Sequence, residues 1–362
     1  MAHPDVVELF GGVDTHSRTH HAAVIDRLGR HLADAEFPAT AAGYRDLHRW
    51  LRSHGDLVAI GVEGTGSYGA GLARHLTAAG GIVVEVDRPD RRARRNKGKS
   101  DPIDAYAAAT AVACGQATGT PKTRCGQVEA IRALRVARTS AVKSRTQAIN
   151  QIRALLVTAP EQVRGAVADL GTAAVIDKLS KLRPGADLSD PANAVKTALR
   201  VLARRYLALD AEACTLQTAI AALVTAYAPA LLQVYGAGVE TASQLLVTAG
   251  DNPQRLRSAA SFAALCGVAP VPASSGKTHR HRLCRGGDRQ ANRALHAIAL
   301  TRMSHDPRTR AYVARRTAEG LSKKEIMRCL KRYIANEIHR IITPQLAQTT
   351  AKTQEHNPHH LT

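Results

Sequence analysis

The sequence predicts an α/β domain at the N-terminus, then a connector of long helices, and then a mainly helical C-terminal region. Three observations indicate this order. Short apolar runs alternate with helical patterns in the first part of the chain, apolar positions recur every three or four residues from about 125 to 230, and basic residues gather after Pro229. Alternating strands and helices require a sheet covered by helices, whereas the three-to-four-residue period is typical of packed helices.

The α/β pattern begins with three strands. We expect two strands around a polar turn in 6–26 and a third in "HLADAEFP", 31–38. The elements expected next are a helix over 41–55, a strand over 57–65, a helix over 67–81, a strand over 82–87, and after a basic loop the helix that Asp101 opens. Three strands followed by alternating helices and strands is the order of an RNase H-like fold.

Two long helical segments, 127–159 and 194–228, flank a middle that contains Pro184 and Pro191. Packed as an antiparallel hairpin or coiled coil, they would form a self-association element. Two ordinary packed helices are the alternative. The chain as a whole is thus expected to divide into an α/β domain in 1–122, a helical connector in 123–229, a C-terminal domain in 230–345 and a flexible tail in 346–362.

The charge of the chain predicts a polyanionic partner. Its 362 residues include 50 Lys and Arg against 30 Asp and Glu, a net charge of +20. Between Arg255 and Arg340 there are 19 basic against 5 acidic residues, which favours salt-dependent binding to a phosphate backbone. Aromatic residues make up only 3% of the chain, so a reader of single strands built on stacked rings is disfavoured.

The six cysteines have no pair at zinc-ligand spacing, and we interpret them as reduced, mostly packed thiols. We find no N-terminal apolar segment and no run of about 18 apolar residues. A cytoplasmic location is therefore expected.

Four acidic residues fall at positions where this fold brings distant segments together. Asp14 ends the first expected strand, Glu63 ends the fourth, and Asp101 and Asp104 lie one turn apart at the start of a helix. Four converging carboxylates repel one another unless divalent cations lie among them, and Mg²⁺ prefers such oxygen ligands. Two such ions could activate an attacking oxygen and stabilise the leaving oxygen of a phosphodiester.

A basic run precedes this helix and would hold a phosphate strand against the metal site; it consists of Arg91, Arg92, Arg94, Arg95, Lys97 and Lys99. An alternative for the helix start needs no metal. Asp101 before Pro102 is a good N-cap, and Asp104 is an acid favoured by the helix dipole.

The C-terminal region offers a glycine turn and a serine turn. Gly236 and Gly238 lie between two helices, where a helix-hairpin-helix turn would present N–H groups to phosphates; a plain connection is the alternative. In "ASSGK", Ser275 precedes a glycine and could attack phosphorus. The alternative is that Ser-Ser-Gly here forms a simple turn, as it commonly does. The surrounding cations would stabilise the developing charge and bind the nucleic acid; they are Lys277, Arg280, Arg282, Arg285 and Arg289.

Six motifs in order resemble transposases of the insertion-sequence 110 family, the DEDD-type recombinases related to Piv invertases. They are "GVDTHS", "GVEGTGSYG", "KSDPIDAYA", "VYGAGVETASQLL", "SAASFAALCGVAPVPASSGK" and "RGGDRQANRALH", and the likeness extends from about residue 8 to 345. The resemblance implies a RuvC-like domain whose metal-binding tetrad falls on Asp14, Glu63, Asp101 and Asp104. It also implies a transposase domain whose nucleophilic serine falls on Ser275, with Ser274 one residue away.

The mechanism that the resemblance implies is strand exchange through a phosphoserine link to DNA. The Mg²⁺-bound tetrad would assist from a neighbouring protomer of a homodimer or homotetramer, and strands would exchange through a junction-like intermediate. The resemblance further implies a structured non-coding guide RNA that pairs with donor and target double-stranded DNA.

Three other functions fit parts of the pattern. An RNase H-like nuclease or Holliday-junction resolvase would use the same acids with water as the nucleophile. A sugar kinase or related ATPase would need a second repeat of the fold, which we do not find after residue 125. A non-catalytic DNA-binding protein would not depend on Glu63 or Asp101.

Overall fold

The computed structural model describes residues 8–86, 100–252, 255–275, 281–282, 284 and 286–355, with side chains as far as 344. The chain forms two compact units. The first comprises the described residues of Met1–Gly126, Ala249–Phe262 and Leu346–Thr362, and the second those of Gln127–Thr248 and Ala263–Gln345. The four-part division of the chain stays a prediction.

A five-stranded mixed sheet forms the centre of the first unit. Its strands are β1 (Glu8–Thr15), β2 (Thr19–Asp26), β3 (His31–Pro38), β4 (Asp56–Glu63) and β5 (Val83–Val86). Their order is β3-β2-β1-β4-β5; β1, β2 and β3 pair antiparallel, while β1, β4 and β5 pair parallel. The three N-terminal strands and the α/β order predicted from the sequence are confirmed, and the sheet is mixed.

Helices cover both faces of this sheet. The helices are α1 (Ala41–Arg52), α2 (Ala70–Ala78) and α4 (Asp101–Ala113). Leu47 and Leu51 of α1 and Leu72 of α2 pack with Val13 and Ile60 in one buried cluster. Ala108 and Val112 of α4 pack in a second cluster with Ala59 and Val86. Because side chains alternate along a strand, α1 and α2 cover one face and α4 covers the other.

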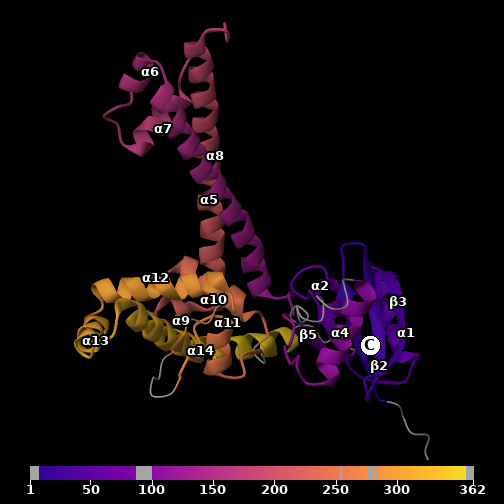
Figure 1. The fold of residues 1–362 in the computed structure, drawn as a ribbon. Coiled ribbons are helices and arrows are strands. Elements are labelled where there is room, and N and C mark those ends of the chain that lie inside the picture. Colours follow the sequence, from indigo (N-terminus) through magenta and orange to yellow (C-terminus); the bar gives the residue numbers. More distant parts are fainter. Residues whose placement is uncertain are drawn as a thin grey trace, which may run out of the picture. The chain divides into compact units, whose positions relative to one another are not determined.

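The second unit begins with two long helices that lie side by side, α5 (Gln127–Thr158) and α8 (Pro191–Tyr227) (Figure 1). Asp190 caps α8 by accepting the N–H of Ala192, and Pro191 occupies the first turn, where its missing N–H costs nothing. The short helices α6 (Glu161–Gly165) and α7 (Thr172–Ser180) pack at the far end of the pair around Ile152, Leu179 and Leu199. The predicted long helices are confirmed, whereas a coiled coil stays a prediction.

The rest of the C-terminal half is mostly helical, as predicted. The helices are α9 (Pro229–Leu232), α10 (Val239–Ala249), α11 (Ala259–Leu265), α12 (Arg289–His305), α13 (Pro307–Ala318) and α14 (Lys323–Glu355). A two-stranded hairpin lies between α11 and α12 and consists of β6 (Val271–Pro272) and β7 (His281–Arg282).

One sequence-based interpretation needs correction. The cysteines are free thiols, as expected, but they are not mostly packed: Cys114, Cys125 and Cys214 are exposed, and only Cys266 is buried.

Among the described residues, one helix, α8, is long and apolar enough to cross a membrane by length and composition. This is weak support for a membrane span, because helices of soluble proteins pass the same test and α8 packs along α5.

Candidate active site

The ends of two parallel strands bring Asp14 and Glu63 together. β1 and β4 pair in parallel up to Val13 and Val62, so the two acids occupy the next position on adjoining strands. Gly12 of β1 and Gly61 of β4 face α4, and by strand alternation Asp14 and Glu63 point to that same side of the sheet. Both acids therefore project toward the helix that carries the other two.

Glycines let α4 lie directly on the sheet. A Cβ built on Gly12 would lie 2.1 Å from the Ala105 carbonyl oxygen, and one on Gly61 would lie 2.6 Å from that of Ala108. Only a residue without a side chain permits such close packing. The contact carries the first turn of α4, with Asp101 and Asp104, toward the ends of β1 and β4, and Asp104 is buried there.

The capping alternative for Asp101 is wrong by one residue. Ser100 is the N-cap of α4, its backbone is extended, and its side chain makes no cap hydrogen bond. The Asp101 carboxylate instead lies 3.2 Å from the imidazole of His16. Asp101 is therefore the first residue of α4 and not its N-cap.

Sequence reasoning missed His16, two residues after Asp14. Its Nε2 lies 3.2 Å from Asp14 Oδ2 and 3.2 Å from Asp101 Oδ1, and the three potential ligand atoms lie within 4.8 Å of one another. Asp14 Oδ2 and His16 Nε2 are buried atoms for which the structure shows no hydrogen-bond partner. The motif "DTHS" contained the signal, since imidazole and carboxylate together are common metal ligands.

The electrostatics of this cluster favour a cation. Burial raises the pKa of the Asp14 carboxyl, and the nearby carboxylates of Asp104 and Asp101 raise it further, while His16 opposes them. A divalent ion among these groups would offset the repulsion that a buried carboxylate meets here. The oxygen and nitrogen donors of Asp14, His16 and Asp101 thus suit a divalent metal.

A second polar network supports the loop that follows Glu63. The Thr65 hydroxyl donates to Glu85 Oε1 at 2.6 Å, and the guanidinium of Arg255 reaches Glu85 Oε2 at 3.3 Å. Arg255 also donates to the Thr120 carbonyl at 2.6 Å, and its side chain is only 11% exposed. A segment from the C-terminal half of the sequence is therefore built into the first unit, where it contacts Glu85 of β5.

In the second unit, the predicted nucleophile lies on the hairpin that β6 and β7 form. Ser274 and Ser275 are both exposed, so Ser275 is accessible to a large substrate. Arg282 pairs with Val271 in the hairpin and is exposed, and Arg289 is exposed at the start of α12. The other predicted cationic positions lie outside the described residues; they are Arg91, Arg92, Arg94, Arg95, Lys97, Lys99, Lys277, Arg280 and Arg285.

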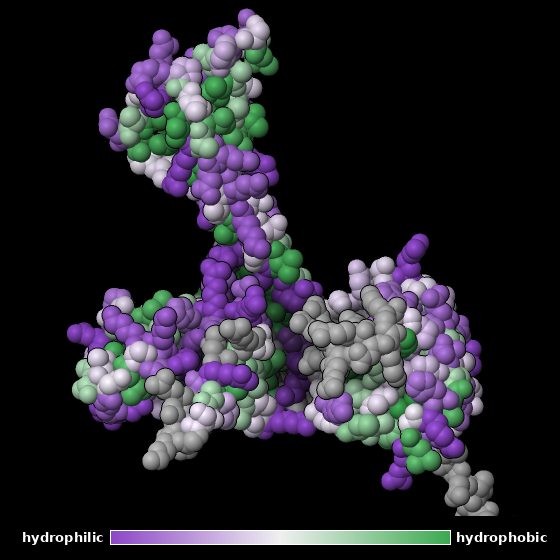
Figure 2. Space-filling view, viewed as in Figure 1, coloured by the Kyte–Doolittle hydropathy of each residue, from purple (hydrophilic) through white to green (hydrophobic). Residues whose placement is uncertain are grey.

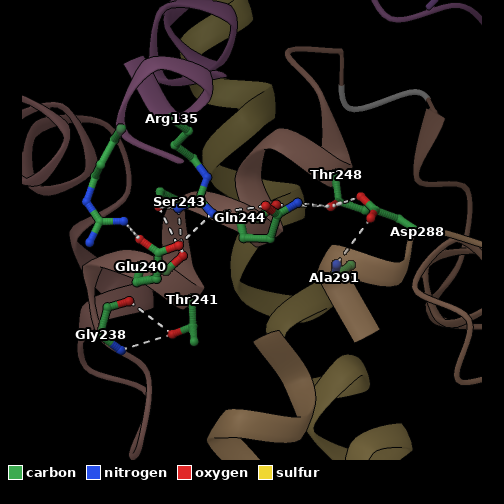
Figure 3. A network of polar contacts seen from close by, with 10 residues as sticks. Arg135, Gly238, Glu240, Thr241, Ser243, Gln244, Thr248, Asp288 and Ala291 are labelled. Atoms are coloured by element: carbon green, nitrogen blue, oxygen red, sulfur yellow. Dashed lines mark hydrogen bonds and ion pairs between the residues drawn. The ribbon is translucent and has the colours of Figure 1, made fainter. Parts of the chain in front are cut away.

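The glycine turn leads into a network that holds α10 in place (Figure 3). Gly236 has a positive φ of 81°, as a tight turn requires, and the Gly238 N–H donates to the Thr241 hydroxyl at 3.0 Å. Because that N–H already has a partner, phosphate binding by Gly238 would require the hydroxyl to exchange. Binding of nucleic acid by the two glycines stays a prediction.

The same network links three helices (Figure 3). Arg135 of α5 donates to Glu240 Oε1 at 2.8 Å and to Gln244 Oε1 at 3.0 Å, both on α10. At the other end of α10, the Thr248 hydroxyl donates to Asp288 at 2.6 Å. Asp288 is the N-cap of α12, the helix that follows the serine hairpin. Charged and capping contacts thus connect α5, through α10, to the start of α12.

Two family models match the chain in succession. Residues 11–160 match the DEDD transposase model of IS110, and residues 228–314 match a model described as the transposase IS116/IS110/IS902 family. The first includes all four acids and His16, and the second includes the glycine turn and Ser275.

Individual relatives match over different lengths. A 43.6 kDa protein of insertion element IS110 from Streptomyces coelicolor is 37% identical over 36% of this chain and 33% of its own length. A protein of the IS117 mini-circle from the same organism is 26% identical over 76% of this chain and 79% of its own length. A 42 kDa protein of insertion element IS900 from Mycobacterium paratuberculosis is 30% identical over 38% of this chain and 35% of its own length. The alignments thus span about a third of the length of two of these relatives and most of the third.

The family matches agree in order with the structure: the first covers the mixed sheet and its acidic cluster, and the second covers the serine hairpin with the helices around it. The chain therefore belongs to the IS110 family of transposases.

Proposed function

We propose that the chain cuts and rejoins DNA strands as the transposase of a mobile element, with Ser275 as the nucleophile and a Mg²⁺ site at Asp14, Glu63, Asp101 and Asp104. The observation that carries this proposal is the meeting of Asp14, His16 and Asp101 at the strand ends, within a chain of this family. The exposure of Ser275 on a hairpin supports the role given to the serine.

The proposed reaction is a transesterification that conserves bonds. The Ser275 oxygen bonds to phosphorus, and the bond from phosphorus to one sugar oxygen breaks. The proton of the serine hydroxyl passes to the released sugar oxygen, which becomes a hydroxyl. A hydroxyl of the partner strand then attacks the phosphoserine and restores the serine. A bound divalent ion would supply charge stabilisation for the attacked phosphate. Asp14 and Asp101 would hold it, and Arg282 and Arg289 would position the strand.

The partners proposed are double-stranded donor and target DNA, together with a structured non-coding guide RNA. The net charge of +20 supports binding to both nucleic acids through their phosphates. A bacterial cytoplasmic location follows from this role.

The chain is also proposed to act as a homodimer or homotetramer. Apolar side chains gather over the end of the long helices that carries α6 and α7 (Figure 2). Val157, Leu170 and Leu188 are exposed there. An exposed apolar patch of this kind is typical of a self-association surface.

Trapping of the covalent intermediate tests the serine. Purified protein is incubated with labelled element-end DNA, its RNA and Mg²⁺, and the adduct is detected after denaturation. We expect an adduct with the wild type and with Ser274→Ala, and none with Ser275→Ala, while all three bind DNA equally. A normal adduct yield from Ser275→Ala would remove this serine from its role.

A nuclease or junction resolvase is the second candidate, because the acidic cluster is assembled within the first unit alone. Such an enzyme would cut DNA with a metal-activated water. Metal-dependent cutting of equal rate in Ser275→Ala and the wild type, with no adduct in either, would favour this candidate.

Sequencing of the RNA that copurifies with the protein tests the guide. We expect one structured transcript from the flank of the element to be strongly enriched over total cellular RNA. Retention of RNA in proportion to its cellular abundance would contradict guidance by a specific RNA.

A further inference from the structure

A pocket of about 570 Å³ lies in the second unit beside the hairpin that carries Ser275, and the proposed function gives it no role. One wall is the chain from Gly267 to Pro270 together with His281 and Arg282 of β7. The opposite wall comes from the end of α13 and the first turns of α14, with Arg316, Arg328 and Lys331. A volume of this size is typical of pockets that bind small ligands.

Lys331 gives this pocket a buried cation that has no carboxylate partner in the described part of the chain. Only 7% of the residue is exposed. Its Nζ donates to Asn292 Oδ1 at 2.8 Å, and no ion pair of Lys331 is found among the residues that the structure describes. Burial, together with the nearby Arg328, lowers the pKa of the ammonium group. A buried charge with only a neutral partner is costly, and an anion in the pocket would offset that cost.

Two hydrogen bonds orient the side chain of Asn292 so that its oxygen accepts the bond from Lys331. Its amide nitrogen donates to the carbonyls of Cys266 at 3.3 Å and Gly267 at 2.9 Å. These bonds direct the side-chain oxygen toward the lysine. The ammonium is therefore held at a defined place on the pocket wall, and among the residues that the structure describes it uses only one of its three donors.

The other charges of the lining are mostly positive. Arg282 is exposed on β7 and makes no ion pair with any residue that the structure describes. Glu325 is the one acid among the lining residues; it accepts hydrogen bonds from the backbone and hydroxyl of Ser322 and lies 3.9 Å from the guanidinium of Arg328. The basic residues of the lining are Arg282, Arg316, Arg328, Lys331 and Arg332. This balance favours an anionic ligand.

The remaining surface of the pocket is apolar. Val268, Ala269 and Pro270 contribute to one wall, and Leu321 and the ring of Tyr333 contribute to the other. Tyr333 is 57% exposed, so one face of its ring can accept a stacked base. A free phosphate would use only the cations, whereas a nucleotide would use the cations and the apolar walls.

We propose that this pocket binds one unpaired nucleotide of the DNA strand that Ser275 cuts, with its phosphate on Lys331 and Arg282 and its base against the apolar walls. The inference rests on the proposed function, because the strand is the one attacked there. Ser275 lies three residues after Pro272, which pairs with His281 of the pocket lining, so that the span is at most about 11 Å of extended chain. A strand bonded at Ser275 therefore passes close to the pocket.

Two cysteines in the lining, Cys284 and Cys329, make the proposal testable by alkylation of the full-length Ser275→Ala protein. The rate of N-ethylmaleimide addition to each cysteine is measured by peptide mass spectrometry, with exposed Cys214 of α8 as the internal control. The probe is a 5′-phosphorylated thymidine trinucleotide. At about ten times its dissociation constant we expect alkylation of Cys284 to slow about tenfold and that of Cys214 to stay unchanged.

Two further ligands separate a nucleotide pocket from a simple anion site. Thymidine lacks the phosphate and inorganic pyrophosphate lacks the base, so each is expected to protect Cys284 at least about tenfold more weakly than the trinucleotide. Equal protection by pyrophosphate would overturn the nucleotide assignment in favour of a phosphate site. Absence of protection by the trinucleotide would overturn the proposal altogether.

Charge variants then test the cations. Lys331→Gln and Arg282→Gln are each expected to raise the dissociation constant of the trinucleotide about tenfold. Lys324→Gln, on the same helix but exposed and outside the pocket, is the control and is expected to leave it unchanged. Because Arg282 is exposed, its variant stays informative even if Lys331→Gln unfolds. Unchanged affinity in Arg282→Gln would overturn the phosphate contact.

The outcome can be separated from that of the proposed function. The protection assay uses a protein that cannot form the phosphoserine, so it needs no chemistry. Protection without any adduct in the wild type would contradict the serine mechanism and leave nucleotide binding intact. An adduct in the wild type without protection of Cys284 would support the serine mechanism and contradict nucleotide binding in the pocket.

Discussion

Thr15 donates its side-chain hydroxyl to the main-chain carbonyl of Glu63 at 2.8 Å. The bond joins the ends of β1 and β4 just beyond their last paired residues, Val13 and Val62. Strand ends tend to separate where pairing stops, and the two acids of the site lie at this point. The Thr15 hydroxyl therefore fixes the distance between the backbone of Glu63 and that of Asp14.

Replacing Thr15 by valine should weaken metal binding more than it weakens the fold. Valine keeps the shape of threonine but leaves the Glu63 carbonyl without its hydrogen bond, at a cost of about 1 kcal/mol in the free energy of unfolding. We expect Mn²⁺ affinity, measured by isothermal titration calorimetry, to fall several-fold. Thr15→Ser keeps the hydroxyl and serves as the control. Wild-type affinity in Thr15→Val would show that the bond does not position the site.

The raised pKa of Asp14 predicts a pH-dependent cost to the metal-free fold. A carboxyl whose pKa is higher in the folded chain than in the unfolded chain binds its proton more tightly when folded. Its contribution to stability therefore falls as pH rises from the unfolded value of 3.8 through the raised folded value. Above that interval, Asp14→Asn should be more stable than the wild type by about 1 kcal/mol.

Urea unfolding in EDTA at pH 7 and at pH 3 measures this difference. The advantage of Asp14→Asn should be present at pH 7 and vanish at pH 3, where the wild-type carboxyl is protonated in both states. Added divalent metal should make the wild type the more stable protein at pH 7, because the metal stabilises only the wild type. A variant less stable than the wild type at pH 7 in EDTA would contradict the assignment of Asp14 as a strained, buried charge.

Local patterns in the sequence predicted the strands and the placement of two pairs of acids in the site. Strand alternation places Asp14 and Glu63 on one face, and helical spacing places Asp101 and Asp104 in one turn, because both depend on neighbours in the chain. His16 was missed because it follows the end of the regular alternation of β1. Arg255 was missed because it meets Glu85 across 170 residues, and no local period records such a contact.

Arg255 is expected to be a major stabilising contact of the first unit. Its guanidinium binds Glu85 and the Thr120 carbonyl from a buried position, and its removal would leave Glu85 half-buried beside Thr65 alone. We expect Arg255→Met to lower the free energy of unfolding by about 3 kcal/mol. Adding Glu85→Gln should recover part of this loss, since it removes the uncompensated charge. A double-mutant cycle by chemical denaturation measures the coupling, and additive losses would contradict the pair.

Gly12 provides the sharpest test of how the site is assembled. An added Cβ would lie 2.1 Å from the Ala105 carbonyl oxygen and 2.3 Å from the Ala109 nitrogen, both backbone atoms of α4. Because backbone cannot yield as a side chain can, Gly12→Ala must push α4 and its acids away from the strand ends. We expect a loss of about 3 kcal/mol or more in unfolding free energy, together with loss of measurable Mn²⁺ binding.

The matched control is the neighbouring residue on the opposite face. A Cβ on Gly11 would meet the side chains of Leu51, at 3.2 Å, and Ile60, at 3.5 Å, and the leucine can shift by a few tenths of an ångström. Gly11→Ala should therefore cost about 1 kcal/mol or less and leave metal binding intact. Equal effects of the two substitutions on Mn²⁺ affinity would mean that the closeness of α4 to β1 does not bring the acids together. A selective loss in Gly12→Ala would tie the metal site to this single contact.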